Sequence, residues 1–175
     1  VLGVSLRPHL KTAKSVDVAR RLLPGGNGPA TVSTLAEAET FFAAGVHDIL
    51  YAVGIAPQKL PRVVALRASG CDLSVILDNV VQAEEVAKAS SETGERIPVF
   101  IEIDSDGHRG GLRPDDPSLI KIGHTIHEGG AELRGVMTHA GESYTVVGKE
   151  AHAKFAEIER AAAVDAAKAL RAANL

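Results

Sequence analysis

Short apolar runs rich in β-branched residues alternate along the chain with longer amphipathic segments rich in alanine. The apolar runs are nearly continuous rather than alternating with polar residues, which is typical of parallel strands buried on both faces. They predict strands at residues 5–10, 30–33, 48–52, 73–77, 99–103 and 133–138. The amphipathic segments predict helices at residues 16–23, 35–44, 57–68, 80–93, 117–128 and 149–173.

Local signals mark the ends of two predicted helices. Thr34 is followed three residues later by Glu37, which is the spacing of a capping box at a helix N-terminus. Gly45 and Gly94 stand where the second and fourth predicted helices end, and glycine commonly ends a helix. These signals agree with the boundaries that the hydrophobic pattern gives.

Alternation of strands and helices with short connections predicts a parallel α/β fold. Two layouts compete, an open doubly wound sheet and a (β/α)8 barrel. A dinucleotide-binding sheet requires Gly-x-Gly-x-x-Gly after its first strand, whereas the glycines at residues 25–28 precede a strand. We therefore expect a TIM-type (β/α)8 barrel. Because the chain has about six strand–helix units and a complete barrel has eight in roughly 250 residues, we expect an incomplete barrel and a fragmentary chain.

Composition narrows the class of function. Hydrophobic residues make up 45% of the chain and charged residues 23%, as in ordinary globular proteins. A net charge of −3, dispersed basic residues and the absence of tryptophan give no basis for binding nucleic acid. No apolar run is long enough to span a membrane and no signal-peptide pattern opens the chain. Since Cys71 is the only cysteine, we expect a cytoplasmic protein in which this thiol is buried and inert.

The first predicted strand ends beside a lysine. Active-site groups of barrels gather at the carboxyl ends of strands, and Lys11 stands there with His9 and Arg7 close by in sequence. Pro8 keeps the backbone extended. An amine near other cations loses its proton more easily, and the neutral amine can form a Schiff base. A surface lysine after a turn is the alternative interpretation.

Two later strand ends add further polar groups. The glycine-rich loop after residues 99–103 carries Arg109, whose rigid guanidinium suits a phenolate or a carboxylate; a solvated surface loop is the alternative. His139 follows residues 133–138, with Ser143 and Tyr144 just beyond, and an imidazole there can stack on a flat ring, exchange a proton or bind a metal. No Cys-x-x-Cys or His-Glu-x-x-His pattern occurs, so we expect no metal ligands in this chain.

Taken in order, segments 6–12, 32–38, 48–52 and 135–141 resemble the D-threonine aldolase and D-serine dehydratase family of enzymes, which use pyridoxal 5′-phosphate (PLP). The resemblance covers essentially the whole chain, and Arg-Pro-His-x-Lys-Thr is specific to this family. It implies the alanine racemase-like barrel of fold type III. Residues 1–175 would form a partial PLP-binding barrel domain, and the family's C-terminal β-domain would lie outside this chain.

The resemblance also implies the residues of the site. The side chains that would contact or border the cofactor are Lys11, His9, Arg109, His139, Ser143 and Tyr144. Among them Lys11 would form the Schiff base, Arg109 would hydrogen-bond the phenolic oxygen and His139 would lie against the pyridine ring. Ala13 stands where many relatives have a histidine.

The reaction implied for the parent enzyme is that of a PLP-dependent lyase acting on D-β-hydroxy amino acids. An amino-acid racemase of the same fold, a non-catalytic PLP-binding barrel and a barrel lyase without PLP are the alternatives. The family's phosphate-binding segment and its divalent-metal ligands would lie beyond residue 175, so we expect little PLP retention or activity from the chain alone. Relatives pair as homodimers, which we expect of the parent enzyme. The particular D-amino acid stays open.

Overall fold

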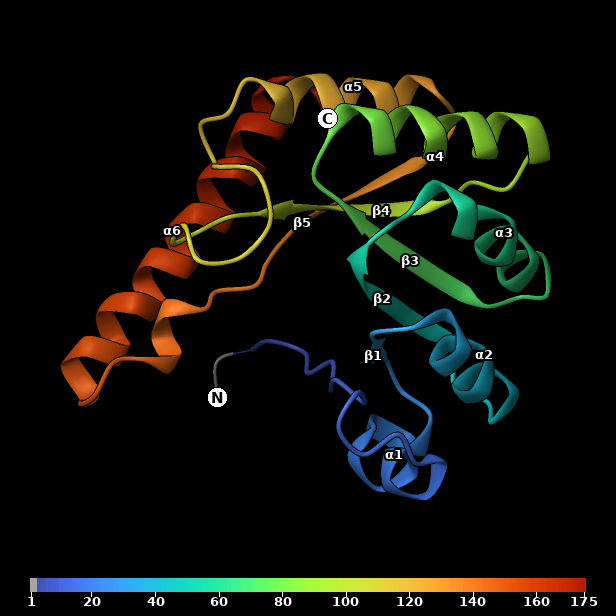
Figure 1. Cartoon of the computed structure of the whole chain (residues 1–175), viewed down its shortest axis with the longest axis horizontal. Coiled ribbons are helices and arrows are strands. Elements are labelled where there is room, and N and C mark those ends of the chain that lie inside the picture. Colours follow the sequence, from blue (N-terminus) through green and yellow to red (C-terminus); the bar gives the residue numbers. More distant parts are fainter. Residues whose placement is uncertain (1–2) are drawn as a thin grey trace. The chain divides into compact units, whose positions relative to one another are not determined.

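The computed structural model describes residues 3–175, and the chain divides into two compact units that meet in sequence between Val75 and Ile76. Helices and strands alternate through both units (Figure 1). Every strand is followed by a helical segment, as the hydrophobic pattern predicts.

The first unit is built around a short pair of parallel strands. Its elements are α1 (Val16–Leu22), the 3₁₀ turn η1 (Pro24–Gly26), β1 (Ala30–Val32), α2 (Leu35–Ala43), β2 (Asp48–Gly54), the 3₁₀ turn η2 (Pro57–Lys59), α3 (Leu60–Ala68) and most of β3 (Asp72–Leu77). The strand order is β1-β2-β3, and β1 runs parallel to β2 with Val32 opposite Tyr51. Helix α2 packs on β1 and β2 through the buried side chains of Leu35, Ala38 and Phe41.

The second unit begins within β3. It contains α4 (Val80–Thr93), β4 (Pro98–Ile103), α5 (Ser118–Glu128), β5 (Glu132–Thr138), the 3₁₀ turn η3 (Glu142–Tyr144) and α6 (Lys149–Ala172). The strand order is β3-β4-β5, and β4 runs parallel to β5 until Ile103 lies opposite Thr138. Helices α4 and α5 pack side by side, and α6 packs along β5 (Figure 1). The carboxyl ends of β4 and β5 therefore lie next to each other.

The predicted helix signals are confirmed. The Glu37 backbone N–H donates to the Thr34 hydroxyl at 3.0 Å, and the Glu37 carboxylate accepts from the Ser33 backbone N–H at 2.8 Å. These two bonds satisfy donors at the start of α2 that have no partner within the helix. Gly94 ends α4 with φ +75°, a left-handed conformation that glycine adopts without strain.

The strand predicted at residues 5–10 is wrong. The segment makes only an isolated parallel bridge between His9 and Thr31. In this bridge the Leu10 N–H donates to the Thr31 carbonyl and the Thr31 N–H donates to the Pro8 carbonyl, each at 2.9 Å. The next ladder bonds toward the N-terminus would need N–H groups from Pro8 and Pro29, and proline has none. Beyond the bridge, the Leu10 carbonyl accepts from Lys14 N–H in a turn instead. A proline in each of the two segments, just before the bridge, thus limits the pairing to one bridge.

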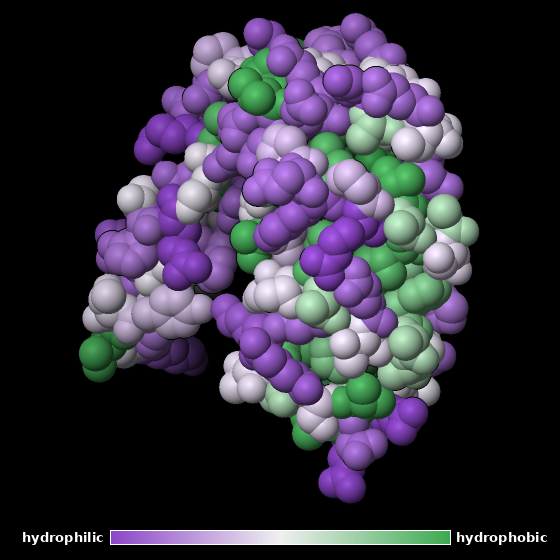
Figure 2. Space-filling model, turned by 45° about the vertical axis from the view of Figure 1, so that its right-hand side comes forward, coloured by the Kyte–Doolittle hydropathy of each residue, from purple (hydrophilic) through white to green (hydrophobic). Residues whose placement is uncertain are grey.

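Hydrophobic side chains on the face shown in Figure 2 are interspersed with hydrophilic ones rather than gathered into one continuous patch. Helix α6 is the longest helix, and charged residues recur along it from Lys149 to Arg171. None of the helices within residues 3–175 combines the length and the hydropathy needed to cross a membrane.

Cys71 is 2% exposed, and burial raises the pKa of its thiol to about 11. Only the thiolate is nucleophilic, so at pH 8 we expect the folded protein to react with iodoacetamide about a hundredfold more slowly than the unfolded chain. The rates can be compared by mass spectrometry with and without guanidinium chloride. Equal labelling rates in the two conditions would contradict the buried, inert thiol.

Candidate functional site

Lys11 lies at the start of the turn that follows the bridge between His9 and Thr31. The Lys11 backbone N–H donates to His9 Nδ1 at 3.2 Å, and His9 Nε2 lies 3.4 Å from the hydroxyl of Ser33, the residue directly after β1. The imidazole therefore ties the lysine's segment to the carboxyl end of β1. Although its own segment is not a strand, the exposed Lys11 stands at a strand's carboxyl end, where barrel enzymes place reactive groups.

Arg7 lies at the opposite end of these strands. Its guanidinium forms a two-pronged pair with the carboxylate of Asp48, the first residue of β2, at 2.7 and 2.9 Å. The expectation that Arg7 acts as a neighbouring cation on Lys11 is therefore wrong, because its charge is balanced at the amino end of β2. Arg7 instead fastens the N-terminal segment to the strand pair.

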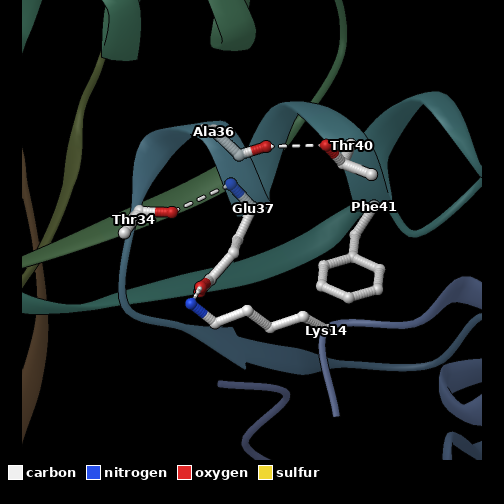
Figure 3. Close-up of a pocket in the computed structure, with 6 residues that line it drawn as sticks. All are labelled: Lys14, Thr34, Ala36, Glu37, Thr40 and Phe41. Atoms are coloured by element: carbon white, nitrogen blue, oxygen red, sulfur yellow. Dashed lines mark hydrogen bonds and ion pairs between the residues drawn. The ribbon is translucent and has the colours of Figure 1, made fainter. Parts of the chain in front are cut away.

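Lys14 belongs to a separate groove of about 290 Å³ on α2 (Figure 3). The groove is lined by Lys14, Thr34, Ala36, Glu37, Thr40 and Phe41. In Figure 3 the Lys14 side chain reaches the Glu37 carboxylate, with 3.2 Å between Nζ and Oε1. Burial raises the pKa of Glu37, but the Ser33 N–H and the Lys14 ammonium outweigh it and leave the pKa below its usual value. Glu37 is thus a carboxylate that engages Lys14.

This pairing separates the two lysines. Among the residues that the structure describes, no ion pair or hydrogen bond engages the Lys11 ammonium, whereas Lys14 is paired with Glu37. A covalent bond to a carbonyl group needs an amine that is accessible and not committed to a carboxylate. Lys11 rather than Lys14 is therefore the candidate nucleophile.

In the second unit, the loop after β4 closes on its own strand. We call residues 104–111 the β4 loop. Leu112 N–H donates to the Glu102 carbonyl at 2.9 Å, and Asp104 N–H donates to the Leu112 carbonyl at 2.8 Å, so the base of the loop is bonded on both sides. Gly111 has φ +118°, and a Cβ there would lie 2.6 Å from the Asp104 nitrogen. The glycine lets the chain return to β4 immediately after Arg109 and Gly110.

The segment after β5 brings a second predicted residue to Arg109. We call residues 139–145 the β5 loop. Arg109 Nη2 lies 3.5 Å from His139 Nδ1, and the His139 side chain is half-buried. Two of the predicted site residues therefore meet at the carboxyl ends of adjacent strands. Ser143 is half-buried in η3, and Tyr144 beside it is 77% exposed.

A carboxyl group that the sequence analysis did not single out lies beside Arg109. Glu102 projects from β4 half-buried; burial and the nearby Asp78 carboxylate raise its pKa, and the opposing effect of Arg109 is smaller. A Cβ placed on Gly110 would be 3.8 Å from one carboxylate oxygen each of Asp78 and Glu102. One acidic residue within the otherwise apolar run Val99–Ile103 was the available signal, since a buried strand normally excludes it.

Comparison with known proteins identifies the fold. Residues 2–175 match the alanine racemase N-terminal domain. The chain belongs to this family. It is 55% identical over 174 residues to the D-threo-3-hydroxyaspartate dehydratase of Delftia sp. strain HT23, covering 99% of this chain and 46% of the relative. It is 32% identical to the D-serine dehydratase of Dictyostelium discoideum, covering 82% of this chain and 39% of that enzyme.

Solved structures of the family agree. The structure of the Delftia dehydratase superposes with a TM-score of 0.94 at 54% identity, covering 99% of this chain and 46% of the dehydratase. The chain thus spans less than half the length of these relatives. The expected incomplete barrel of the alanine racemase kind, and the resemblance that led to it, are both confirmed.

Proposed function

We propose that this chain is the N-terminal, cofactor-binding part of a PLP-dependent lyase that acts on D-β-hydroxy amino acids. The observation that carries the proposal is the 55% identity, across almost the whole chain, to a D-threo-3-hydroxyaspartate dehydratase. That match includes the region of Lys11, Arg109 and His139. When bound, PLP draws electrons from the α-carbon of an amino acid and so weakens the bonds to that carbon.

The donor set of this chain fits such a cofactor. Lys11 offers an exposed amine without a carboxylate partner, which would attach the PLP aldehyde carbon. Arg109 is a permanently charged donor for the phenolic oxygen, and His139 is a flat ring for the pyridine face; the two lie 3.5 Å apart. His9 would hold the Lys11 backbone in place, because it accepts the Lys11 N–H.

The neighbouring residues have supporting roles in this proposal. Ser143 and Tyr144 would border the cofactor and the substrate, and the exposure of Tyr144 leaves its ring available for such a contact. Glu102 lies half-buried near Arg109, and its raised pKa means that this carboxyl group binds a proton more readily than an exposed glutamate does. We further propose that a divalent metal ion serves the reaction through ligands outside this chain; a metal-free form is named among the solved structures of the dehydratase.

The whole enzyme would eliminate water from its substrate, and hydrolysis of the resulting imine by one water molecule would yield a keto acid and ammonia. The 55% identity to a D-threo-3-hydroxyaspartate dehydratase favours this over aldol cleavage, which a D-threonine aldolase, 30% identical over 140 residues, represents. The substrate would be a small D-amino acid, and we place the enzyme in the cytoplasm as a homodimer.

Product analysis of the full-length protein with PLP tests the proposal. We expect keto acid and ammonia from D-threo-3-hydroxyaspartate or D-serine, at least a tenfold loss of rate on chelation, and recovery on adding back a divalent ion. Glycine and an aldehyde would instead indicate aldol cleavage, and an exchange of α-carbon configuration would indicate a racemase. Turnover of the L-substrates alone, or bound PLP without turnover of either enantiomer, would contradict the proposed lyase.

A further inference from the structure

Asp106 connects the two loops that carry Arg109 and His139. One of its carboxylate oxygens, Oδ2, accepts the backbone N–H groups of Gly141 and Glu142, both at 2.9 Å. The other, Oδ1, accepts the N–H of His108 within its own loop at 3.1 Å. A half-buried side chain of the β4 loop thus satisfies two backbone donors of the β5 loop.

The loops also touch where Arg109 leaves the backbone. A Cβ on Gly141 would overlap the His108 ring and lie 3.1 Å from Arg109 Cγ, so the glycine lets these two side chains lie against the β5 loop as they do. A second bridge joins His108 Nδ1 to the Glu142 carboxylate at 3.0 Å. Both of those side chains are more than a third exposed, and such a pair contributes little in water. The Asp106 carboxylate is therefore the main polar connection.

The bonded residues lie close in sequence to the two candidate site residues, Arg109 and His139. Asp106 precedes Arg109 by three residues, and Gly141 follows His139 by two residues. A bond between Asp106 and the Gly141–Glu142 backbone restrains both chains close to the two ring-binding side chains. The backbone N–H of Glu142, with those of Gly141 and His108, lowers the pKa of Asp106, so the acceptor stays ionised at neutral pH.

We propose that Asp106 is a positioning residue that holds Arg109 against His139 before the cofactor binds. The inference rests on the proposed function, because Arg109 and His139 are there assigned to PLP. A ligand that meets ordered groups loses less free energy to their immobilisation than one that must order them itself. Asp106 therefore raises the affinity for PLP without touching it.

The test compares Asp106→Ala with Asp115→Ala in the full-length protein. Asp115 precedes α5, is 85% exposed at its side chain and pairs only loosely with Arg113 at 3.7 Å, so its variant changes the charge equally. Two quantities are measured, the hydrogen exchange of the Gly141 and Glu142 amides without PLP, and the dissociation constant for PLP by spectral titration. We expect Asp106→Ala to speed the hydrogen exchange of both amides at least tenfold and to weaken PLP binding about tenfold.

Further readouts separate positioning from general destabilisation. The Asp115→Ala variant should match the unaltered protein in both measurements, and the unfolding midpoint of the PLP-free protein should change little in either variant. Asp106→Asn keeps one carbonyl acceptor and the side-chain volume, so it should give an intermediate PLP affinity. It also replaces Asp106→Ala in the comparison should the alanine variant fail to fold.

The outcomes distinguish this inference from the proposed function. Faster hydrogen exchange of the two amides with an unchanged affinity for PLP would overturn the positioning role and leave the proposed function standing. Unchanged hydrogen exchange of these amides would show that Asp106 does not join the loops. Failure of the unaltered protein to bind PLP would instead refute the proposed function, and with it the assignment of Asp106 to PLP binding.

Discussion

Replacing Lys11 with alanine is expected to abolish covalent attachment of PLP to the full-length protein and to lower kcat/KM on the order of a thousandfold or more. The methyl group of alanine cannot form a bond to the PLP aldehyde carbon, and no other described amine combines this position with freedom from a carboxylate. The absorbance of the PLP–lysine Schiff base, near the edge of the visible range, should disappear. Borohydride reduction followed by mass spectrometry should find no modified peptide.

The matched control is Lys14→Ala. Lys14 lies in the same turn but is paired with Glu37 at 3.2 Å, so its loss should leave the attachment of PLP intact. Because the Glu37 carboxylate is only 9% exposed, the variant should also lose some stability, but not the attachment. A reducible bond between PLP and the Lys11→Ala protein, with none in Lys14→Ala, would assign the attachment to Lys14.

The second large effect is expected for Gly111→Ala. Its φ of +118° is strained for any residue with a Cβ, and that Cβ would meet the backbone at Asp104 and Ile103 at 2.6 and 2.7 Å. Backbone atoms cannot move aside as a flexible side chain can, so the base of the β4 loop must open. We expect a loss of about 2 kcal/mol or more in the free energy of unfolding, measured by urea denaturation, and weaker PLP binding because Arg109 moves.

Gly110→Ala is the control one residue away. A Cβ there meets only the carboxylate oxygens of Asp78 and Glu102, each at 3.8 Å, which is ordinary van der Waals contact. The same chemical change should therefore cost under about 0.5 kcal/mol, as at most surface positions. Equal losses in the two variants would mean that the return of the loop to β4 does not depend on Gly111.

Much of the fold follows from hydrophobic periodicity and local signals. Helix α4 has the predicted bounds, residues 80–93, because asparagine at its start and Gly94 at its end coincide with the limits of the apolar stripe. The strand at residues 5–10 was mispredicted because the missing hydrogen-bond donors lie in both of the segments that would have to pair. Pro8 alone is tolerated at a strand edge, and the ladder is lost because the neighbouring segment also has a proline, Pro29, just before the bridge.

The site was predictable only in part, and the reasons are physical. Arg109 and His139 follow apolar runs that form adjacent parallel strands, β4 and β5, so a sequence pattern could place them at neighbouring ends, and they do meet. Asp106 serves as an acceptor for backbone N–H groups 35 and 36 residues away, and no residue pattern encodes such a partner. The pairing of Arg7 with Asp48, 41 residues apart, depends likewise on the folded strand register.

The closed base of the β4 loop has a consequence for protein engineering. Because Leu112 returns to Glu102 and Asp104, the interior of the loop can be rewritten without disturbing the register of β4 with β5. A library that varies residues 105 and 108, and keeps Asp104, Asp106, Gly107 and Gly111, would change the surroundings of Arg109 while preserving its anchorage. The same segment from a relative of different substrate preference could be exchanged as a cassette, with the two flanking strands serving as its fixed frame.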